Sequence, residues 1–412
     1  LARELEAAGV PLLGTPTASI HRAEDRGQFG ALLDSLDLQA PAWGVAHSED
    51  EALEIAGRLG YPVLSRPSYV LGGRAMAISH GPDELRGFLA PAFAASATVL
   101  IDRFLGDALE VDVDALFDGT TCRIMGVMEH LEEAGVHSGD STCSLPPHTL
   151  SAAVIARLED ITGRIARALE VRGPINLQFA LQGESIHVLE VNPRASRTLP
   201  FVAKATGVAW ARVATRVMLG DRLETMDLPT VAGGLWAVKA PVFPFARFPG
   251  SRPVLGPEMR STGEAMGIGP SFAEAHVRAL LGTGVALPAT GATALWLAPA
   301  GADADLRAAL EALGVTVVDG PREGQAEGPG NGAAAAAEGL RTGRFTWVVA
   351  PASVGQADGW DALRRLATDR RVPWFTHRGG VRALIAALEV TRTRTGWTLT
   401  ALQDTQRSAV EV

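Results

Sequence analysis

The stretch Glu190-Val191-Asn192-Pro193-Arg194 decides the fold that we expect, because it reads as the polar end of a β-strand that stops at a proline. The strand that carries it, Ser185–Val191, follows a second apolar run at Ile175–Leu181. The residues Gln182-Gly183-Glu184 separate these runs and are typical of a turn. The sequence therefore predicts an antiparallel hairpin whose second strand ends in polar side chains.

Oxygen-bearing side chains gather on one face of this predicted hairpin. Because side chains alternate along a strand, Glu190 and Asn192 share a face and lie about 7 Å apart. If the hairpin pairs in register, Gln178 on the first strand converges with Glu190. A carboxylate with amide oxygens suits Mg²⁺, whose other positions would be filled by phosphate oxygens and water. A solvated polar strand face is the alternative explanation of the same pattern.

A glycine-containing run upstream points to phosphate binding: Arg66-Pro67-Ser68-Tyr69-Val70-Leu71-Gly72-Gly73-Arg74. Gly72 and Gly73 let a backbone approach a phosphate closely, and such a loop can close over it as a lid. Arg66 and Arg74 add a guanidinium on either side. A Gly-Gly pair between strands is more often an ordinary turn, so the run decides nothing by itself.

The run Glu129–Ser141 is a third candidate. It joins His137 to Ser138, Asp140 and Ser141, as a site for oxyanions or a monovalent cation would. His137 could equally be a loop histidine with a structural partner, and its polar neighbours could be turn formers.

Arg194 and Arg197 follow the proline that ends the second strand of the hairpin. Guanidiniums beside a metal face can neutralise charge on a transferring phosphoryl group. An arginine by itself is weak evidence for a functional site in this chain, however. Lys204 and Lys239 are its only lysines, so arginine is its usual basic residue wherever one occurs. The order of the motifs (glycine loop, acidic strand, histidine loop, metal hairpin) is more specific than any one of them, and it indicates ATP.

The composition bounds the class of protein. With 412 residues, 47% of them hydrophobic and 20% charged, the chain is typical of a globular protein of two or three domains. A net charge of −9 without a basic stripe argues against nucleic-acid binding. No apolar run approaches the roughly 18–20 residues that span a bilayer. Cys122 and Cys143 are too few for a disulfide framework or a zinc site, so we expect a reducing cytoplasm.

Hydrophobic periodicity divides the chain further. Residues 1–20 read as a helix and a short strand ending at Gly14, and residues 22–60 as helical. The first six residues lack the regions of a signal peptide and read as mid-helix, so we expect a cut N-terminus. Strands are predicted at 62–66, 75–79, 98–103, 109–117 and 123–129, before a helix that ends near 169. Beyond 284, predicted strands at 292–298, 314–318, 345–350 and 373–376 alternate with helices, which indicates a small parallel α/β domain.

Taken together, these motifs resemble the C-terminal half of the large subunit of carbamoyl-phosphate synthetase, an ATP-grasp enzyme. The runs that carry the resemblance are Arg66–Met76, Glu129–Leu145, Asn176–Ala180, Glu190–Gly207 and Leu255–Met266. It is close over about residues 1–280 and fainter beyond, where the pattern resembles the family's methylglyoxal-synthase-like regulatory domain. The implied fold class is α/β, with an α+β ATP-grasp fold followed by a small parallel-sheet α/β domain.

The resemblance implies four parts. Residues 1–20 would be a remnant of the pre-ATP-grasp domain, 21–212 the ATP-grasp domain, 213–284 the end of the carbamoyl-phosphate unit with a linker, and 285–412 the regulatory domain. We expect the last part to be degenerate, because the loop Val317–Arg322 lacks the family's threonine while Thr376–Gly380 keeps part of a second effector loop.

The resemblance also implies a role for each candidate residue. Mg²⁺ or Mn²⁺ would be ligated by Gln178, Glu190 and Asn192, and K⁺ is a further expected ion. The candidate catalytic residues are Arg66, His137, Arg194 and Arg197, the last two facing the transferring group. The implied contacts to ATP are Arg26 and Arg66 on the phosphates, Gly72 and Gly73 in the lid, Arg103, Leu105 and Glu110 around adenosine with Glu110 on the ribose, and Gly135, Val136, His137 and Ser138 along the nucleotide.

The implied reaction is the phosphorylation of carbamate by ATP, the final step of carbamoyl-phosphate synthesis for arginine and pyrimidine biosynthesis. The carboxyphosphate-forming half is missing, so the implied partners are that N-terminal half and a glutaminase small subunit, with no nucleic acid and no membrane. Two alternatives stay open. One is a non-catalytic ATP-binding or regulatory fragment; the other is an ATP-grasp ligase that joins a carboxylate to an amine, which the run Val136–Ser141 disfavours.

Overall fold

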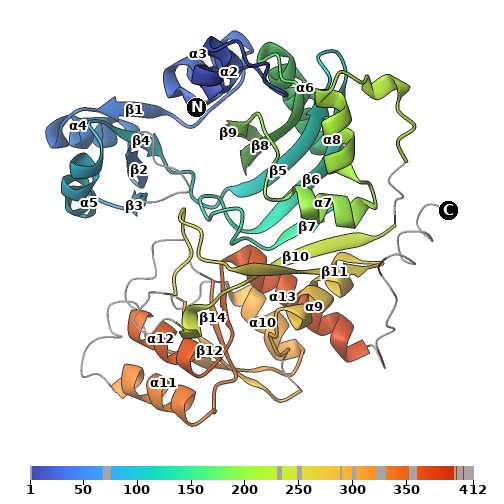
Figure 1. Cartoon of the computed structure of the whole chain (residues 1–412). Helices are drawn as coiled ribbons and strands as arrows, with labels where there is room; N and C mark the ends of the chain where they lie inside the picture. The colour runs from blue at the N-terminus through green and yellow to red at the C-terminus, as the bar shows by residue number, and fades with distance from the viewer. Residues whose placement is uncertain are drawn as a thin grey trace.

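The computed structural model describes residues 2–67, 76–229, 234–247, 253–287, 290–298, 303–321, 331–351 and 360–393, with residues 396 and 402. Within these ranges the chain forms a small four-stranded sheet, a seven-stranded sheet and a second four-stranded sheet, each with helices packed on it (Figure 1). This mixture of helices and sheets confirms the predicted α/β class. No helix in these ranges is long and apolar enough to cross a bilayer.

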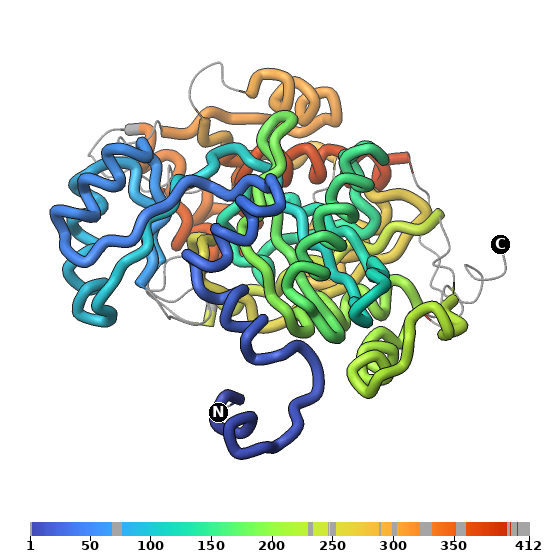
Figure 2. Tube along the Cα trace, turned by 90° about the horizontal axis from the view of Figure 1, so that it is seen from above, coloured from blue at the N-terminus to red at the C-terminus, as the bar shows by residue number. Residues whose placement is uncertain are grey.

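Three helices begin the chain: α1 (Ala2–Ala7), α2 (Thr17–Glu24) and α3 (Arg26–Ser35). The segment before α2 projects from the body of the protein (Figure 2). Asp25 caps α3, since its carboxylate accepts a hydrogen bond from the backbone N–H of Gln28. The strand that we predicted to end at Gly14 is wrong, because residues 10–14 pair with no strand in the described part of the chain.

The small four-stranded sheet is antiparallel and has the order β1-β4-β2-β3. Its strands are β1 (Trp43–Ala46), β2 (Val63–Pro67), β3 (Ala77–Ser79) and β4 (Val99–Arg103), with α4 (Glu49–Leu59) and α5 (Pro82–Ala95) packed on one face. We call this unit the small lobe. Periodicity predicted residues 22–60 as helical and so missed β1, a four-residue edge strand that is defined only by its pairing with β4.

The seven-stranded sheet has the order β11-β10-β7-β6-β5-β8-β9. Each neighbouring pair in it is antiparallel. Its strands are β5 (Leu109–Phe117), β6 (Cys122–Glu133), β7 (Cys143–Leu145), β8 (Gly173–Gln182), β9 (Ser185–Asn192), β10 (Trp236–Val242) and β11 (Gly263–Gly269). The strands predicted at 109–117 and 123–129 and the predicted hairpin are therefore confirmed.

Helices cover one face of this sheet fully and the other only in part. The first face packs on α2, α3 and α6 (Ala152–Ala168). The apolar stripe of α6 includes Leu158, Ile161 and Ile165. Burying each such side chain stabilises the fold by about 1.5–3 kcal/mol. On the opposite face, α7 (Leu199–Thr206) and α8 (Trp210–Met218) pack around Leu116 and Met128. The β5 side chains that precede Leu116 on this second face are acidic.

The third sheet is parallel and has the order β13-β12-β14-β15, which confirms the predicted parallel α/β domain. Its strands are β12 (Thr293–Trp296), β13 (Thr316–Asp319), β14 (Trp347–Ala350) and β15 (Trp374–Thr376). The helices are α10 (Ala304–Ala312), α11 (Asn331–Arg341), α12 (Asp361–Asp369) and α13 (Arg378–Thr393). Along the chain, α9 (Phe272–Gly282) joins the second sheet to the third, while the short 3₁₀ turns η1 (Leu223–Thr225) and η2 (Phe245–Arg247) precede β10 and follow it.

The α/β domain touches the seven-stranded sheet where α13 begins. His377 places Nδ1 3.0 Å from the backbone oxygen of Leu131 on β6. A Cβ added to Gly379 would lie 2.7 Å from the same oxygen, so only glycine allows this approach. Deeper in the interface, the buried His276 of α9 places Nδ1 3.2 Å from the backbone oxygen of Ala383.

Candidate active site on the polar sheet face

Acidic side chains line the part of the seven-stranded sheet that α7 and α8 do not cover. Along β5, alternation places Glu110, Asp112 and Asp114 on the face opposite the apolar core. All three are buried, at 3%, 1% and 1% exposure, so they are not a solvated strand face. Only Glu110 was singled out from the sequence, although the pattern acid-x-acid-x-acid on one strand is a readable signal of a polar face that is turned towards a site.

The hairpin β8–β9 forms as predicted, with a register shift (a β-bulge) between Gln178 and Phe179. Gln178 lies directly opposite Glu190, and Asn176 opposite Asn192. The Asn192 side-chain amide donates to Oε1 of Glu190 at 2.7 Å, which confirms that these two side chains share a face. On the other side, Gln178 pairs with Asp112 of β5, so the hairpin edge continues into the acidic strand. These oxygen atoms fit the hard-oxygen ligand set that Mg²⁺ takes.

The two arginines after the hairpin point to different partners. Arg194 donates to Oδ1 of Asn192 at 3.0 Å and to the backbone oxygen of Ala195 at 3.1 Å. Arg197 lies with Nη1 3.4 Å from Nε2 of His137. Each arginine thus lies beside a residue of the predicted site. Both are exposed, so both are accessible to an anion.

The histidine loop is held in place by backbone contacts. Gly135 adopts a φ of 99° and donates its N–H to Oε2 of Glu110 at 3.1 Å. Nζ of the buried Lys239 donates to the backbone oxygen of Ser138 at 2.8 Å. Val136 is buried at 3% exposure. Burial lowers the pKa of His137 and the guanidinium of Arg197 lowers it further, so this imidazole is held neutral.

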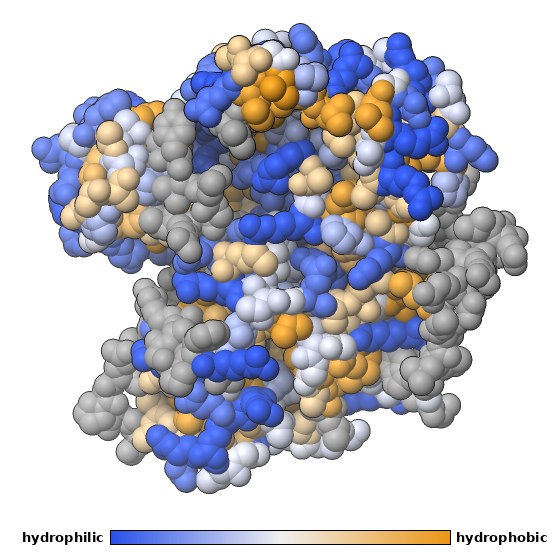
Figure 3. Space-filling model, in the orientation of Figure 1, coloured by the Kyte–Doolittle hydropathy of each residue, from blue (hydrophilic) through white to orange (hydrophobic). Residues whose placement is uncertain are grey.

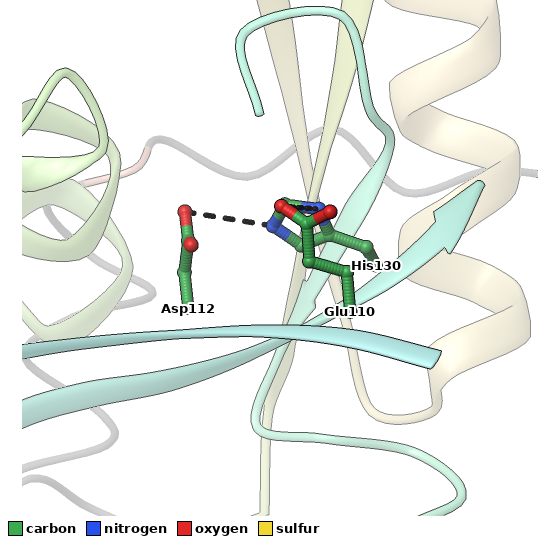
Figure 4. A group of neighbouring side chains, drawn as sticks. All are labelled: Glu110, Asp112 and His130. Carbon is green, nitrogen blue, oxygen red and sulfur yellow. Dashed lines mark ion pairs between the residues drawn. The ribbon is translucent and has the colours of Figure 1, made fainter. Parts of the chain in front are cut away.

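Glu110 and Asp112 flank the imidazole of His130 from β6, as Figure 4 shows. Nδ1 of His130 lies 3.7 Å from Glu110, and Nε2 lies 3.6 Å from Asp112. A single metal ion cannot use both ring nitrogens, and each faces a different carboxylate. The arrangement therefore suits an imidazolium between two carboxylates better than a metal held by all three side chains.

Burial and charge together set the protonation of this group. Burial raises the pKa of Glu110 to about 7, and the charge of His130 opposes that rise. Burial alone would lower the pKa of His130, but Asp112 and Glu110 raise it above its ordinary value. Glu110, Asp112 and His130 together therefore retain a proton near neutral pH. This proton reduces the net negative charge that is buried on this face of the sheet.

Arg26 and Arg66 come together although the sequence separates them widely. Arg26 forms an ion pair with one carboxylate oxygen of Asp102, and Nε of Arg66 lies 3.5 Å from the other oxygen. Arg26 also donates to the backbone oxygen of Leu189 in β9, at 3.3 Å. Asp102, on β4, was not predicted. It links the small lobe to the seven-stranded sheet at the place where the predicted phosphate arginines meet.

The remaining predicted residues lie around this junction or outside the described ranges. Arg103 is exposed at the end of β4, and Leu105 packs with Ala108 and Ala180 beside Glu110. Gly72 and Gly73 fall within residues 68–75, outside the described residues. On the face drawn in Figure 3, hydrophilic side chains gather across the middle of the molecule, between the small lobe and the α/β domain.

Solved structures with a similar fold come from biotin carboxylases. One is the biotin carboxylase domain dimer of the Hydrogenobacter thermophilus 2-oxoglutarate carboxylase in complex with MgADP, ADP and bicarbonate. Its TM-score is 0.51 at 18% identity, over 58% of this chain and 55% of that one. The Campylobacter jejuni biotin carboxylase complexed with β,γ-ATP has a TM-score of 0.50 at 14% identity, over 59% and 56%. These similarities concern the fold alone.

Sequence comparison then gives the family. Residues 25–226 match the carbamoyl-phosphate synthase L chain, ATP binding domain. The carbamoyl phosphate synthase large chain, C-terminal section, of Methanocaldococcus jannaschii is 41% identical over 427 residues, which cover 95% of this chain and 68% of that protein. The chain belongs to the carbamoyl phosphate synthase large chain family, as its motifs suggested.

Many relatives are much longer than this chain. The large chain of Rubrobacter xylanophilus is 50% identical over 312 residues, which cover 75% of this chain but 29% of that protein. The large chain of Ralstonia nicotianae is 53% identical over 298 residues, which cover 71% and 28%. The chain thus spans less than a third of the length of these relatives.

Proposed function

We propose that this chain phosphorylates carbamate with ATP to give carbamoyl phosphate and ADP, as one part of a carbamoyl phosphate synthase large chain. The observation that carries the proposal is the register of β8–β9, in which Gln178 lies opposite Glu190 and Asn192 bonds to the same carboxylate. In a member of this family, such an oxygen-rich edge next to Arg194 and Arg197 suits a magnesium nucleotide and a transferring phosphoryl group.

In this proposal, a carbamate oxygen attacks the γ-phosphorus in line and ADP leaves, so no covalent enzyme intermediate is needed. Gln178, Glu190 and Asn192 would hold Mg²⁺, which when bound would neutralise charge on the phosphates. Arg194 and Arg197 would stabilise the charge that spreads over the transferring group. The protein contributes mainly position and electrostatics.

The rest of the nucleotide would lie along the junction between the small lobe and the seven-stranded sheet. Arg26 and Arg66 would exchange their shared carboxylate, Asp102, for phosphate oxygens. Glu110 would accept a hydrogen bond from the ribose, and Arg103 and Leu105 would line the adenosine pocket. The loop that holds Gly72 and Gly73 would close over the phosphates and exclude water, which matters because carbamate is labile.

The wider setting is part of the same proposal. Mn²⁺ could replace Mg²⁺, and K⁺ could bind at the histidine loop. The remaining steps would need the carboxyphosphate-forming half and a glutaminase small subunit, in a pathway to arginine and pyrimidines. We propose a cytoplasmic location, with which the free thiols of Cys122 and Cys143 agree.

The direct test is the reverse reaction, because it needs no other half. Purified protein is incubated with Mg²⁺, ADP and carbamoyl phosphate, and ATP is measured with a coupled luminescence assay. We expect ATP to form in proportion to the enzyme added. A protein that binds MgATP by calorimetry but makes no ATP would instead be the non-catalytic fragment.

A variant tests the metal edge separately. Glu190→Ala removes the carboxylate that Gln178 faces, and we expect it to weaken MgATP binding at least tenfold while binding of metal-free ATP changes little. Glu184→Ala is the matched control, since Glu184 is an exposed residue in the turn of the same hairpin. Equal MgATP affinities in Glu190→Ala and wild type would refute the metal assignment.

A further inference from the structure

A buried carboxylate lies directly beneath the loop that carries the two arginines. Asp114 on β5 is 1% exposed. Its Oδ1 accepts a hydrogen bond from the side-chain amide of Asn176 at 2.9 Å. Its Oδ2 accepts one from the hydroxyl of Ser196 at 2.8 Å and another from Thr198 at 2.7 Å. Every partner of this carboxylate is therefore a neutral donor, and two of them come from a single short segment.

That segment, residues 193–198, joins the end of β9 to the start of α7. Its anchored residues are Ser196 and Thr198, whereas the side chains of Arg194 and Arg197 have other partners. Arg194 bonds back to Asn192, and Arg197 reaches the ring of His137. Ser196 also accepts a hydrogen bond from the backbone N–H of Leu199 at 3.1 Å, which ties the anchor to the first turn of α7.

The chemistry of this anchor makes it costly to break. Burial raises the pKa of Asp114 to about 6, while the hydrogen bonds from Thr198 and Asn176 lower it. Removing donors from a buried carboxylate leaves an unsatisfied charge, and such a group is one of the more expensive defects in a fold. An anchor of this kind fixes the path of the loop, because both hydroxyls must return to the same oxygen, Oδ2 of Asp114.

We infer that Asp114 is a positioning residue, which acts through Ser196 and Thr198 to hold the guanidiniums of Arg194 and Arg197 against the transferring phosphoryl group. The inference rests on the proposed function for the chemistry, but the anchor itself is a structural claim. It assigns to Asp114 no contact with ATP, metal or carbamate. Its effect belongs to the transition state, when the arginines must be in place, and not to nucleotide binding.

The test removes the two hydroxyls and keeps the carboxylate. In the double variant Ser196→Ala/Thr198→Val, we expect kcat for ATP synthesis from ADP and carbamoyl phosphate to fall about 10–100-fold. The affinity for MgADP by calorimetry should change less than about twofold, because the metal edge is untouched. Thr162→Val is the matched control, since Thr162 is fully buried and bonds only within its own helix, to the oxygen of Leu158.

A conservative variant separates positioning from simple loss of structure. Asp114→Asn keeps one side-chain oxygen that can accept from both hydroxyls. Its new NH₂ group would face Asn176, whose amide can turn so that its oxygen accepts from that group. We expect this variant to keep most of the wild-type kcat. The inference is overturned if the hydroxyl-deleted double variant keeps wild-type kcat, or if it loses kcat and MgADP affinity together.

Hydrogen exchange measures the anchor without reference to activity. Peptides covering 193–199 should exchange faster in Ser196→Ala/Thr198→Val than in wild type or Thr162→Val. If wild-type protein makes no ATP, the proposed function fails, whereas the exchange of this segment still decides whether the anchor holds it. Unchanged exchange in the double variant would overturn the anchor whatever the activity.

Discussion

Asp118 fastens the turn between β5 and β6, the strands that carry Glu110 and His130. Its Oδ1 accepts hydrogen bonds at 2.8 Å from the backbone N–H groups of Thr120 and Thr121 and from the Thr120 hydroxyl. Its Oδ2 accepts one at 2.9 Å from the backbone N–H of Leu223 in η1. We expect Asp118→Asn to loosen this end of the sheet, because it removes the charge and turns an amide towards Leu223.

The magnitude follows from the protonation of the carboxylate, which is 4% exposed. Burial alone would raise the pKa of Asp118, but the hydrogen bonds from Thr121, Leu223 and Thr120 lower it from 3.8 to about 2. A carboxyl whose pKa falls from 3.8 to about 2 on folding contributes roughly 2 kcal/mol of folding stability at pH 7. Because the folded pKa is the lower one, this contribution is full above about pH 4 and disappears as the pH falls through about 2.

The assay is urea unfolding of wild type and Asp118→Asn, followed by tryptophan fluorescence at pH 7 and pH 3. We expect the difference in unfolding free energy to be roughly 2 kcal/mol at pH 7 and about half of that at pH 3. Asp160→Asn is the control, since Asp160 is 67% exposed and pairs only weakly with Arg164, at 3.6 Å. A difference that stays constant between the two pH values would refute the electrostatic reasoning.

Two glycine substitutions test close backbone approaches. Gly379→Ala should weaken the contact between α13 and β6, because its Cβ would lie 2.7 Å from the oxygen of Leu131, whereas Gly380→Ala meets nothing within 4 Å and serves as the control. Limited proteolysis between the domains should accelerate only in the first variant. Gly267→Ala should lower the melting temperature strongly, since its Cβ would lie 2.0 Å from a backbone oxygen of α9. Gly57→Ala, in open space within α4, should instead stabilise by about 0.5–1 kcal/mol, and equal effects of the two would contradict the packing described above.

The elements that could be predicted are those whose pattern is local. The hairpin β8–β9 was predictable because two apolar runs flank a short turn, whereas the β-bulge that brings Glu190, and not Leu189, opposite Gln178 could not be read from that pattern. The α/β domain was predictable because its strands and helices alternate at regular spacing. The helix α6 was predictable from its apolar stripe, and the Ser151 hydroxyl caps it by accepting a hydrogen bond from the backbone N–H of Val154.

The elements that could not be predicted depend on distant partners. The strand β1 is only four residues long and has no periodicity to read until β4 lies beside it. The strand expected before Gly14 has an apolar sequence but no neighbour to pair with among the described residues. Domain boundaries at 20, 212 and 284 and the roles of the site residues stay predictions.

The sequence by itself determined the chemical types at the site and their order, and period-two alternation assigns Glu190 and Asn192 to one face of their strand without any other part of the chain. The pairing of β8 with β9, with its β-bulge, then brings Gln178 opposite Glu190. Only the tertiary structure brought Arg26 and Arg66 to Asp102 and His130 between Glu110 and Asp112. The physical reason is that these pairings join strands and helices far apart in the chain. They are fixed by sheet order and burial, and no local pattern encodes which strand becomes the neighbour of which.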